Sequence, residues 1–268
     1  MHAMANPAAK AANTLLQAWV DGTQLSPASF PSAPTSVCEM YEVHLAIEQH
    51  PLCLSPFEGV GGYKLGALGA EGEKALYAPL FRRFIVDAPG RRLSMSALNL
   101  SNFEAEIGIL MGENVTPRAN GQPHSSAAVW VAASQVVLCI ECCGKRGHPE
   151  AYAAMPKLGA FADTLSSGGV VMGPRFPAAG PDAAALCCTT QMHINDELVV
   201  EGSGSKAAEG DPIAALAFLA NHMNGRGLSL KRGQVVITGA TCNTKLPKLH
   251  DRIRATFSGF GSVEMVVS

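Results

Sequence analysis

The clearest pattern of apolar and polar positions in the chain runs over residues 102–111. Every odd position of this stretch is apolar, whereas Glu104 and Glu106 stand at even positions. Side chains alternate between the two faces of a strand, so this period of two predicts a half-buried strand. The two glutamates would then point to the same side of the sheet.

A second apolar run, at residues 136–143, is interrupted only by Glu141. Its length and composition predict a buried strand, and the stretch before it, residues 127–135, is expected to be helical. The dipeptide Asn195-Asp196 predicts a turn between two further strands. The remaining strands are expected in four segments: 192–200, which spans that turn, 235–238, 253–257 and 259–267.

Helical spacing of apolar positions is strongest at residues 211–223. Asp211 can cap this helix, and Pro212 suits its first turn. Two more helices are expected at residues 13–19 and 35–50. Because the last two-thirds of the chain is rich in strands and poor in helices, these signals predict an α+β fold.

Composition narrows the classes of function. The chain has 268 residues and a formal net charge of −2, which gives no electrostatic reason to expect a nucleic-acid or membrane partner. The most apolar stretch, residues 127–143, is too short and too polar to span a bilayer. No signal peptide precedes the eight cysteines, and their spacing does not match that of a cysteine-based metal site. We therefore expect reduced thiols in a soluble, cytoplasmic protein.

Three carboxylates are the strongest candidates for chemistry. Glu104 and Glu106 have Cα atoms about 7 Å apart on a strand, and carboxylates that share one pocket repel each other. Glu141 is costly to bury in an apolar run without a partner. Three carboxylates favour a hard cation such as Mg²⁺ or Mn²⁺. The alternative from spacing alone is a solvated strand face, with Glu141 reaching water at the end of its strand.

The segments Glu104-Ala105-Glu106 and Ile140-Glu141 are similar to the metal site of the fumarylacetoacetate hydrolase superfamily. The resemblance is closest to its branch of 2-keto-4-pentenoate hydratases and 4-oxalocrotonate decarboxylases. Other segments between residues 15 and 267 fit this branch in the same order: Gly62-Tyr63-Lys64-Leu65-Gly66, Ala162-Asp163-Thr164-Leu165-Ser166-Ser167-Gly168, Asn195-Asp196-Glu197, Gly210-Asp211-Pro212, Leu219-Ala220-Asn221, Thr238-Gly239-Ala240 and Gly259-Phe260-Gly261-Ser262-Val263.

The resemblance implies a mixed β-sheet roll with a small N-terminal helical region. We expect that region at residues 1–55 and a metal-binding catalytic domain at residues 56–268. The resemblance also implies a homo-oligomer built from dimers, a small 2-keto acid as the substrate and a role in aromatic catabolism.

The resemblance assigns roles to individual positions as well. A 2-keto acid offers a carboxylate and a keto oxygen that a divalent cation can bind together while acting as a Lewis acid. The resemblance implies Glu104, Glu106 and Glu141 as the metal ligands. It implies Lys64 as the acid/base group, and Ser166, Ser167 and Gly168 as a turn that binds the substrate. From the residues alone, the alternatives are an exposed lysine on a strand and a plain Ser/Gly turn.

Two acids of the family's hydratases are missing from this chain. Those hydratases carry a carboxylate after the lysine, but no acid lies between Glu73 and Asp87 here. The family segment E-I-V-D-S-R reads Glu141-Cys142-Cys143-Gly144-Lys145-Arg146, so its aspartate is missing too. These departures put hydration in doubt more than metal binding.

Three functions therefore stay open. The first is a metal-dependent lyase, either a hydratase or a decarboxylase, that acts on a 2-hydroxydienoate or a related 2-keto acid. The second is a C–C bond hydrolase or an oxaloacetate-type decarboxylase of the wider superfamily. The third is a non-catalytic paralogue that binds a metal and a keto acid.

Overall fold

The protein is seen in a computed structural model that describes most of the chain. The described residues are 6–66, 76–88, 93–94, 96–179, 185–205, 207, 211–244 and 247–268. Gly210 and residues 67–75, which entered the sequence comparison above, lie outside them.

Helices form the first part of the structure. The Ser36 hydroxyl accepts a hydrogen bond from the Glu39 amide at 3.2 Å, and the Glu39 carboxylate accepts one from the Thr35 amide at 2.8 Å, so the second helix starts with a reciprocal cap. The helices predicted near residues 13–19 and 35–50 are confirmed. The elements are α1 (Pro7–Asp21), α2 (Val37–Gln49) and α3 (Pro51–Leu54).

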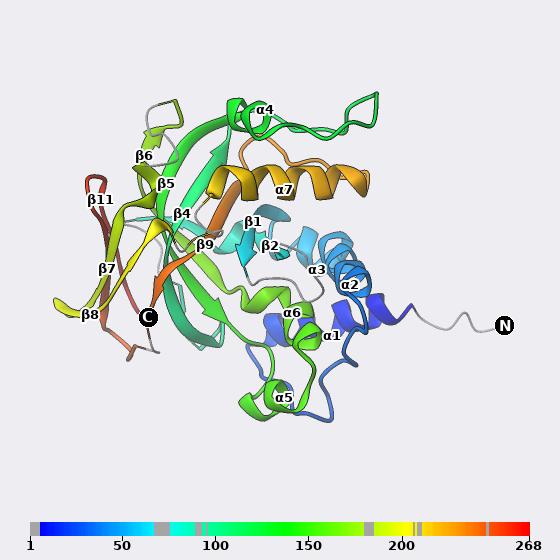
Figure 1. The fold of residues 1–268 in the computed structure, drawn as a ribbon. Coiled ribbons are helices and arrows are strands. Elements are labelled where there is room, and N and C mark those ends of the chain that lie inside the picture. Colours follow the sequence, from blue (N-terminus) through cyan, green and yellow to red (C-terminus); the bar gives the residue numbers. More distant parts are fainter. Residues whose placement is uncertain are drawn as a thin grey trace.

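A curled sheet of seven strands forms the body of the protein (Figure 1). Its strands run in the order β2-β1-β9-β4-β5-β6-β3, and β4 and β5 pair antiparallel near its centre. The alternating strand and the apolar strand predicted from the sequence are confirmed as β4 and β5. The strands are β1 (Val60–Gly66), β2 (Leu76–Phe81), β3 (Ile85–Asp87), β4 (Leu100–Met111), β5 (Ala133–Gly144), β6 (Gly169–Pro177) and β9 (Val235–Asn243).

A smaller antiparallel sheet lies beside the large one, in the order β11-β10-β7-β8. The predicted turn at Asn195-Asp196 joins β7 to β8, and both of its residues have positive φ, 51° and 71°. Positive φ is a conformation that Asn and Asp tolerate better than most residues. The strands are β7 (Thr189–Ile194), β8 (Glu197–Ser203), β10 (Arg252–Phe257) and β11 (Gly261–Val266).

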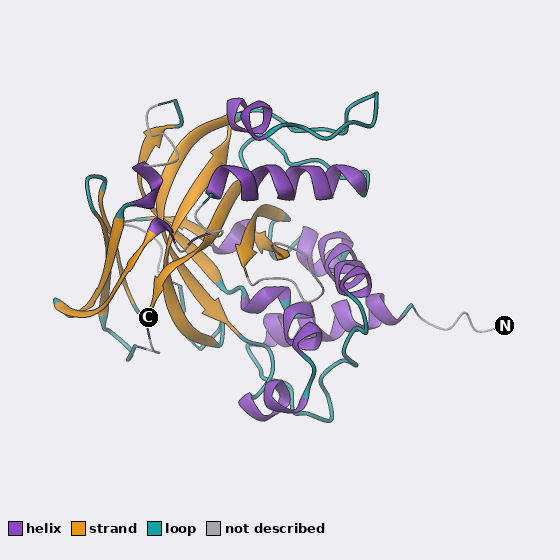
Figure 2. Ribbon diagram, viewed as in Figure 1, coloured by secondary structure: helices purple, strands orange, loops and turns teal. Residues whose placement is uncertain are grey.

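The remaining helices connect and cover the strands. Figure 2 shows most helices gathered on one side of the molecule and the two sheets on the other. Asp211 caps the predicted C-terminal helix by accepting a hydrogen bond from the Ala214 amide. The helices are α4 (Ser126–Val131), α5 (Pro149–Ala154), α6 (Lys157–Ala162) and α7 (Pro212–Gly225), with short 3₁₀ turns at Arg82–Phe84, Thr164–Ser166 and Ala185–Cys187.

The α+β prediction is confirmed, with local differences. Residues 133–135, predicted as helical, belong to β5, because Gln135 pairs with Leu110 of β4 and with Pro177 of β6. Strands β2 and β6 have no clear pattern in the sequence, since Pro79 interrupts one and glycines begin the other. Tertiary pairing overrides local preference in these places.

The boundary predicted at residue 55 stays a prediction. Helix α2 packs against α6, which lies beyond that boundary.

Among the described helices, none combines the length and the apolar character that a membrane crossing requires.

Candidate metal and substrate site

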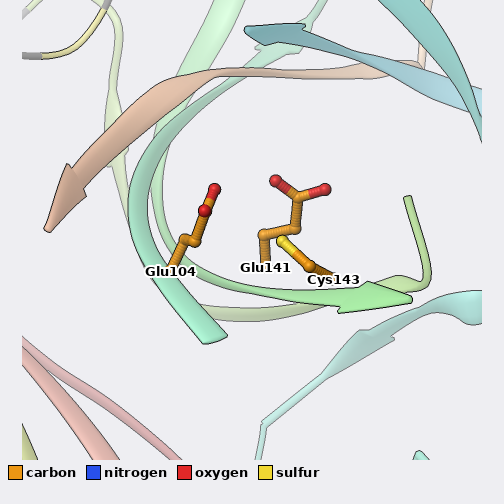
Figure 3. Close-up of side chains that lie close together, drawn as sticks. All are labelled: Glu104, Glu141 and Cys143. Atoms are coloured by element: carbon orange, nitrogen blue, oxygen red, sulfur yellow. The ribbon is translucent and has the colours of Figure 1, made fainter. Parts of the chain in front are cut away.

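Strand pairing brings the predicted carboxylates together. In the register of β4 and β5, Glu104 lies directly opposite Glu141, and Glu106 lies opposite Cys139. Residues two apart on a strand share a face, so all three glutamates lie on one side of the sheet. Figure 3 shows Glu104, Glu141 and Cys143 rising from the same side of the two strands. The ligand atoms of these three side chains all lie within 4.8 Å of one another.

These carboxylates are shielded from water. The exposed fraction is 0% for Glu141 and 1% for Glu106, and Glu104 is half-buried. Burial, followed by the charge of Glu141, raises the pKa of the Glu104 carboxyl. Burial, followed by the charges of Glu141 and Glu104, raises the pKa of the Glu106 carboxyl well above its usual value. The solvated strand face that was the alternative from the sequence is therefore absent.

Lys64 of β1 reaches into this group of acids. Its Nζ donates a hydrogen bond to Glu141 Oε1 at 2.6 Å, and only 6% of the residue is exposed. Burial alone would lower the pKa of the Lys64 ammonium, but the surrounding acids, Glu141 first, raise it above its usual value. The lysine is therefore a buried ammonium and not the exposed strand lysine of the alternative.

Glu106 is oriented by the backbone of β9. The Gly239 amide donates a hydrogen bond to Glu106 Oε2 at 2.8 Å. Gly239 has a φ of 106°, which a side chain would disfavour. The pairing of β4 with β9 also shifts register on both sides of Glu106. The segment Thr238-Gly239-Ala240 thus supplies a backbone donor that fixes this carboxylate.

The residues present fit a divalent cation. Three acids face one lysine, so the three carboxylates, when ionised, carry more negative charge than the lysine balances. Glu141 Oε2 is buried and has no hydrogen-bond partner among the described residues. A buried carboxylate oxygen without a partner is costly, and a cation would satisfy it. Glu104, Glu106 and Glu141 are thus placed as the side chains that could hold Mg²⁺ or Mn²⁺.

An apolar surface continues from the acids along the same face of the sheet. Strand phase places it beside the site, because Cys139 pairs with Glu106, Val170 with Glu141 and Ile237 with Lys64. Such a lining strengthens electrostatic interactions by excluding water. The buried members of this cluster are Leu80, Val137, Cys139, Val170, Val235 and Ile237.

The predicted substrate turn adopts a left-handed conformation. Thr164, Leu165 and Ser166 have φ values of 47°, 50° and 58°. Each non-glycine residue in this conformation costs about 1–2 kcal/mol, so tertiary contacts must hold the turn. The Ser167 and Gly168 that follow are buried, and Ser166 is half-buried.

Arg146 supplies those contacts. This arginine, 1% exposed, donates through Nε to Asp163 Oδ1 at 2.7 Å and through a terminal nitrogen to the Ser167 carbonyl at 2.7 Å. Its guanidinium also lies over the Trp19 ring of α1, 4.0 Å from the ring centroid. The Tyr152 hydroxyl donates to the same aspartate. A buried ion pair thus clamps the turn before and after its left-handed residues.

The turn meets the carboxylates through β5. Gly169 and Val170 of β6 pair with Cys142 and Glu141. A Cβ at Gly168 would lie 2.3 Å from the Cys142 carbonyl oxygen, so only glycine allows this approach. The structure therefore brings Gly168 next to the strand that carries Glu141. The role of Ser166, Ser167 and Gly168 in substrate binding stays a prediction.

We expect Gly168→Ala to lower the free energy of unfolding by about 1–3 kcal/mol, because the added methyl group meets backbone that cannot move aside cheaply. The measurement is urea unfolding followed by circular dichroism. Gly225→Ala is the matched control, since a Cβ there meets nothing within 4 Å, and it should leave stability unchanged or slightly higher. Equal midpoints for the two variants would contradict the close approach.

Two residues of this region, Cys143 and Arg146, have no role that the sequence predicts. Cys143 stands two positions after Glu141, so on a strand it must share the face of Glu141. Arg146 ends the segment that departs from the family pattern. Its burial was not foreseeable, because arginine is rarely buried unless it is paired and the pairing is tertiary.

Comparisons with known proteins bear on this site. No protein-family model matches the chain. 2-Keto-4-pentenoate hydratase 1 from Dechloromonas aromatica (strain RCB) is 28% identical over 207 residues, which are 75% of this chain and 75% of that protein. A 2-keto-4-pentenoate hydratase from Paraburkholderia xenovorans (strain LB400) is 26% identical over 261 residues, 95% of this chain and 92% of that protein.

The fold comparison agrees with these relatives. The structure of 4-oxalocrotonate decarboxylase from Pseudomonas putida G7, complexed with magnesium and adipate, matches with a TM-score of 0.79. It is 21% identical, and the match covers 97% of each chain. The expected mixed β-sheet roll is thereby confirmed.

Proposed function

Because the chain belongs to the fumarylacetoacetate hydrolase superfamily, we propose that it is a divalent-metal-dependent lyase. Its branch of the superfamily is that of the 2-keto-4-pentenoate hydratases and 4-oxalocrotonate decarboxylases. The proposed substrate is a small 2-keto acid or 2-hydroxydienoate. The observation that carries the proposal is the buried group in which Glu104 faces Glu141 across two strands and Lys64 donates to Glu141. We propose Mg²⁺ or Mn²⁺ as the cation and Glu104, Glu106 and Glu141 as its ligands.

In this proposal the cation, when bound, supplies Lewis acidity to the keto-acid head of the substrate. Lys64, as a buried ammonium, donates a proton to the substrate or stabilises negative charge that develops on it. Ser166, Ser167 and Gly168 bind the substrate carboxylate. The apolar surface beside the acids keeps bulk water away from the reacting atoms.

The surroundings of Lys64 favour decarboxylation over hydration. Lys64 pairs with Ala78 of β2, so a residue without a carboxylate stands opposite the lysine. The segment after Glu141 carries no further acid through Arg146. Hydration requires a group that activates water. Decarboxylation of a 2-keto diacid breaks the bond to its distal carboxylate, which stands beta or vinylogous to the ketone, and the electrons of that bond pass onto the keto oxygen. This reaction therefore depends mainly on stabilising negative charge at the keto oxygen.

Turnover of a substrate panel tests the reaction. The panel contains 2-hydroxydienoates and 2-keto diacids, each assayed with Mn²⁺ and with a chelator. We expect metal-dependent loss of dienoate absorbance or release of carbon dioxide. A protein that binds pyruvate or oxalate but turns over no member of the panel would be the non-catalytic paralogue instead.

Calorimetry tests the metal site separately. We expect Mg²⁺ and Mn²⁺ to bind the parent protein and to bind Glu106→Ala about 10- to 100-fold more weakly, the size of loss seen when the support of a metal site is removed. Glu113→Ala is the control, since Glu113 is exposed on the segment that follows β4. Absence of binding in the parent would refute the proposed cofactor.

We also propose that the protein forms a homo-oligomer built from dimers. Light scattering would measure the mass of that oligomer.

A further inference from the structure

Cys143 lies beside the proposed metal ligands, but the function proposed above gives its side chain no role. It follows Glu141 by two residues on β5, is 4% exposed and lies on the face of the carboxylates. Among the described residues, the acidic and cysteine side chains that gather within 4.8 Å are Glu104, Glu141 and Cys143. The third glutamate, Glu106, is instead held by the Gly239 amide.

The distances suit a shared ion. Zinc-type cations bind thiolate sulfur at about 2.3 Å and carboxylate oxygen at about 2.0–2.2 Å, so sulfur and oxygen in one tetrahedral shell lie about 3.6 Å apart. Separations within 4.8 Å need only small side-chain rotations to reach that value. Glu141 Oε2 is buried and lacks a hydrogen-bond partner among the described residues. A bound cation would satisfy this oxygen, which is a second observation in favour of a metal at this place.

The two neighbouring cysteines of β5 do not share this position. Cys142 points to the opposite face, where its sulfur lies 3.6 Å from the sulfur of Met265. Cys139 shares the face, but its thiol is directed to the Val137 carbonyl at 3.7 Å and lies opposite Glu106. Position on the strand and direction of the thiol therefore single out Cys143 from its neighbours.

We propose that Cys143 is a ligand of the divalent cation together with Glu104 and Glu141. The site then takes a thiophilic cation of the Zn²⁺ or Co²⁺ class through its sulfur, whereas Mg²⁺, which prefers oxygen, is held by the carboxylates alone. Coordination turns the thiol into a thiolate, and its proton passes to the solvent. The inference rests on the proposed metal site and extends it by adding a sulfur ligand and thiophilic cations to those that the site can hold.

Cobalt is the probe for this proposal, because Co²⁺ bound by a thiolate absorbs light through sulfur-to-metal charge transfer. The full-length protein is titrated with Co²⁺ under reducing conditions. We expect the charge-transfer band in the parent and in Cys142→Ser, the matched control on the opposite face. The band should be absent in both Cys143→Ser and Cys143→Ala, two variants that differ in polarity, so that one failing to fold leaves the other.

Affinities measured by calorimetry complete the test. Loss of a group that only supports a metal ligand weakens binding about 10- to 100-fold, so loss of the sulfur ligand should weaken Zn²⁺ binding by at least about tenfold. Mg²⁺ binding should change by less than about threefold, because magnesium does not use the sulfur.

Each other outcome overturns the proposal in a distinct way. If Co²⁺ binds the parent without a sulfur band, or if the band persists in the Cys143 variants, Cys143 is not a ligand and the glutamate site stands. If neither Co²⁺ nor Mn²⁺ binds the parent, both the ligand role and the proposed metal-dependent function fail.

Discussion

Lys64→Met is expected to lower turnover of the substrate that the panel identifies by about 10²- to 10⁴-fold, the usual contribution of a positioned acid or base. The methionine keeps the length of the side chain but removes the ammonium that donates to Glu141 at 2.6 Å. Binding of Mg²⁺ should survive and should tighten, because the variant removes a positive charge that competes for the same carboxylate. Steady-state kinetics and calorimetry on the same preparation measure the two effects.

Two further variants sharpen this expectation. Lys64→Arg keeps a positive charge but holds its proton too firmly for transfer, so retained turnover would favour charge stabilisation over proton donation. Lys10→Met removes an exposed lysine of α1 and should change neither turnover nor metal affinity. Turnover of Lys64→Met within tenfold of the parent would exclude the lysine from the chemistry.

Arg146→Met is expected to lower the free energy of unfolding by about 3–5 kcal/mol, the effect of removing one partner of a buried ion pair. Arg146 and Asp163 are each 1% exposed, so the remaining carboxylate would be buried without its charge partner. The left-handed turn would lose its contact with the Ser167 carbonyl as well. Urea unfolding measures the loss.

The chain contains its own control for this variant. Arg175 and Asp87 form an ion pair whose side chains are 36% and 67% exposed. Exposed pairs contribute about 0–1 kcal/mol, so Arg175→Met should change stability little. The double variant Arg146→Met/Asp163→Leu should recover part of the loss, because no unpaired charge stays buried. Equal effects of Arg146→Met and Arg175→Met would show that the buried Arg146–Asp163 pair contributes no more to the free energy of unfolding than an exposed pair does.

The Lys64 and Arg146 side chains lie in different parts of one region. Lys64 acts on the carboxylates of β4 and β5, whereas Arg146 holds the turn that leads into β6. The Trp19 ring under Arg146 belongs to α1, so the N-terminal helices support the turn although they lie far from it in the sequence. Loss of the clamp is therefore expected to weaken substrate binding beyond its effect on stability.

Much of the fold followed from local patterns. The period of two at residues 102–111 predicted β4, and the apolar run at 136–143 predicted the main part of β5. Capping and apolar spacing predicted α7 from Asp211 onward. The predictions failed at residues 133–135 and missed β2 and β6, because there the pairing partner and not the local residue preference decided the conformation.

The candidate site divides in the same way. The sequence by itself determined that Glu104 and Glu106 share a face, because alternation along a strand is set by residue order alone. It also determined that Glu141 interrupts an apolar run, and its ordered segments carried the resemblance to the superfamily. The roles assigned from that resemblance stay predictions, and the Lys64 and Glu106 variants test two of them.

Only the tertiary structure decided what those faces meet. The register between β4 and β5 placed Glu141 opposite Glu104, and strand order brought Lys64 to within hydrogen-bond distance of Glu141. The same register put the Cys143 thiol among the acids, and long-range packing buried Arg146 against Asp163. Register and burial depend on contacts between segments far apart in the chain, so a pattern that repeats over a few residues cannot specify them.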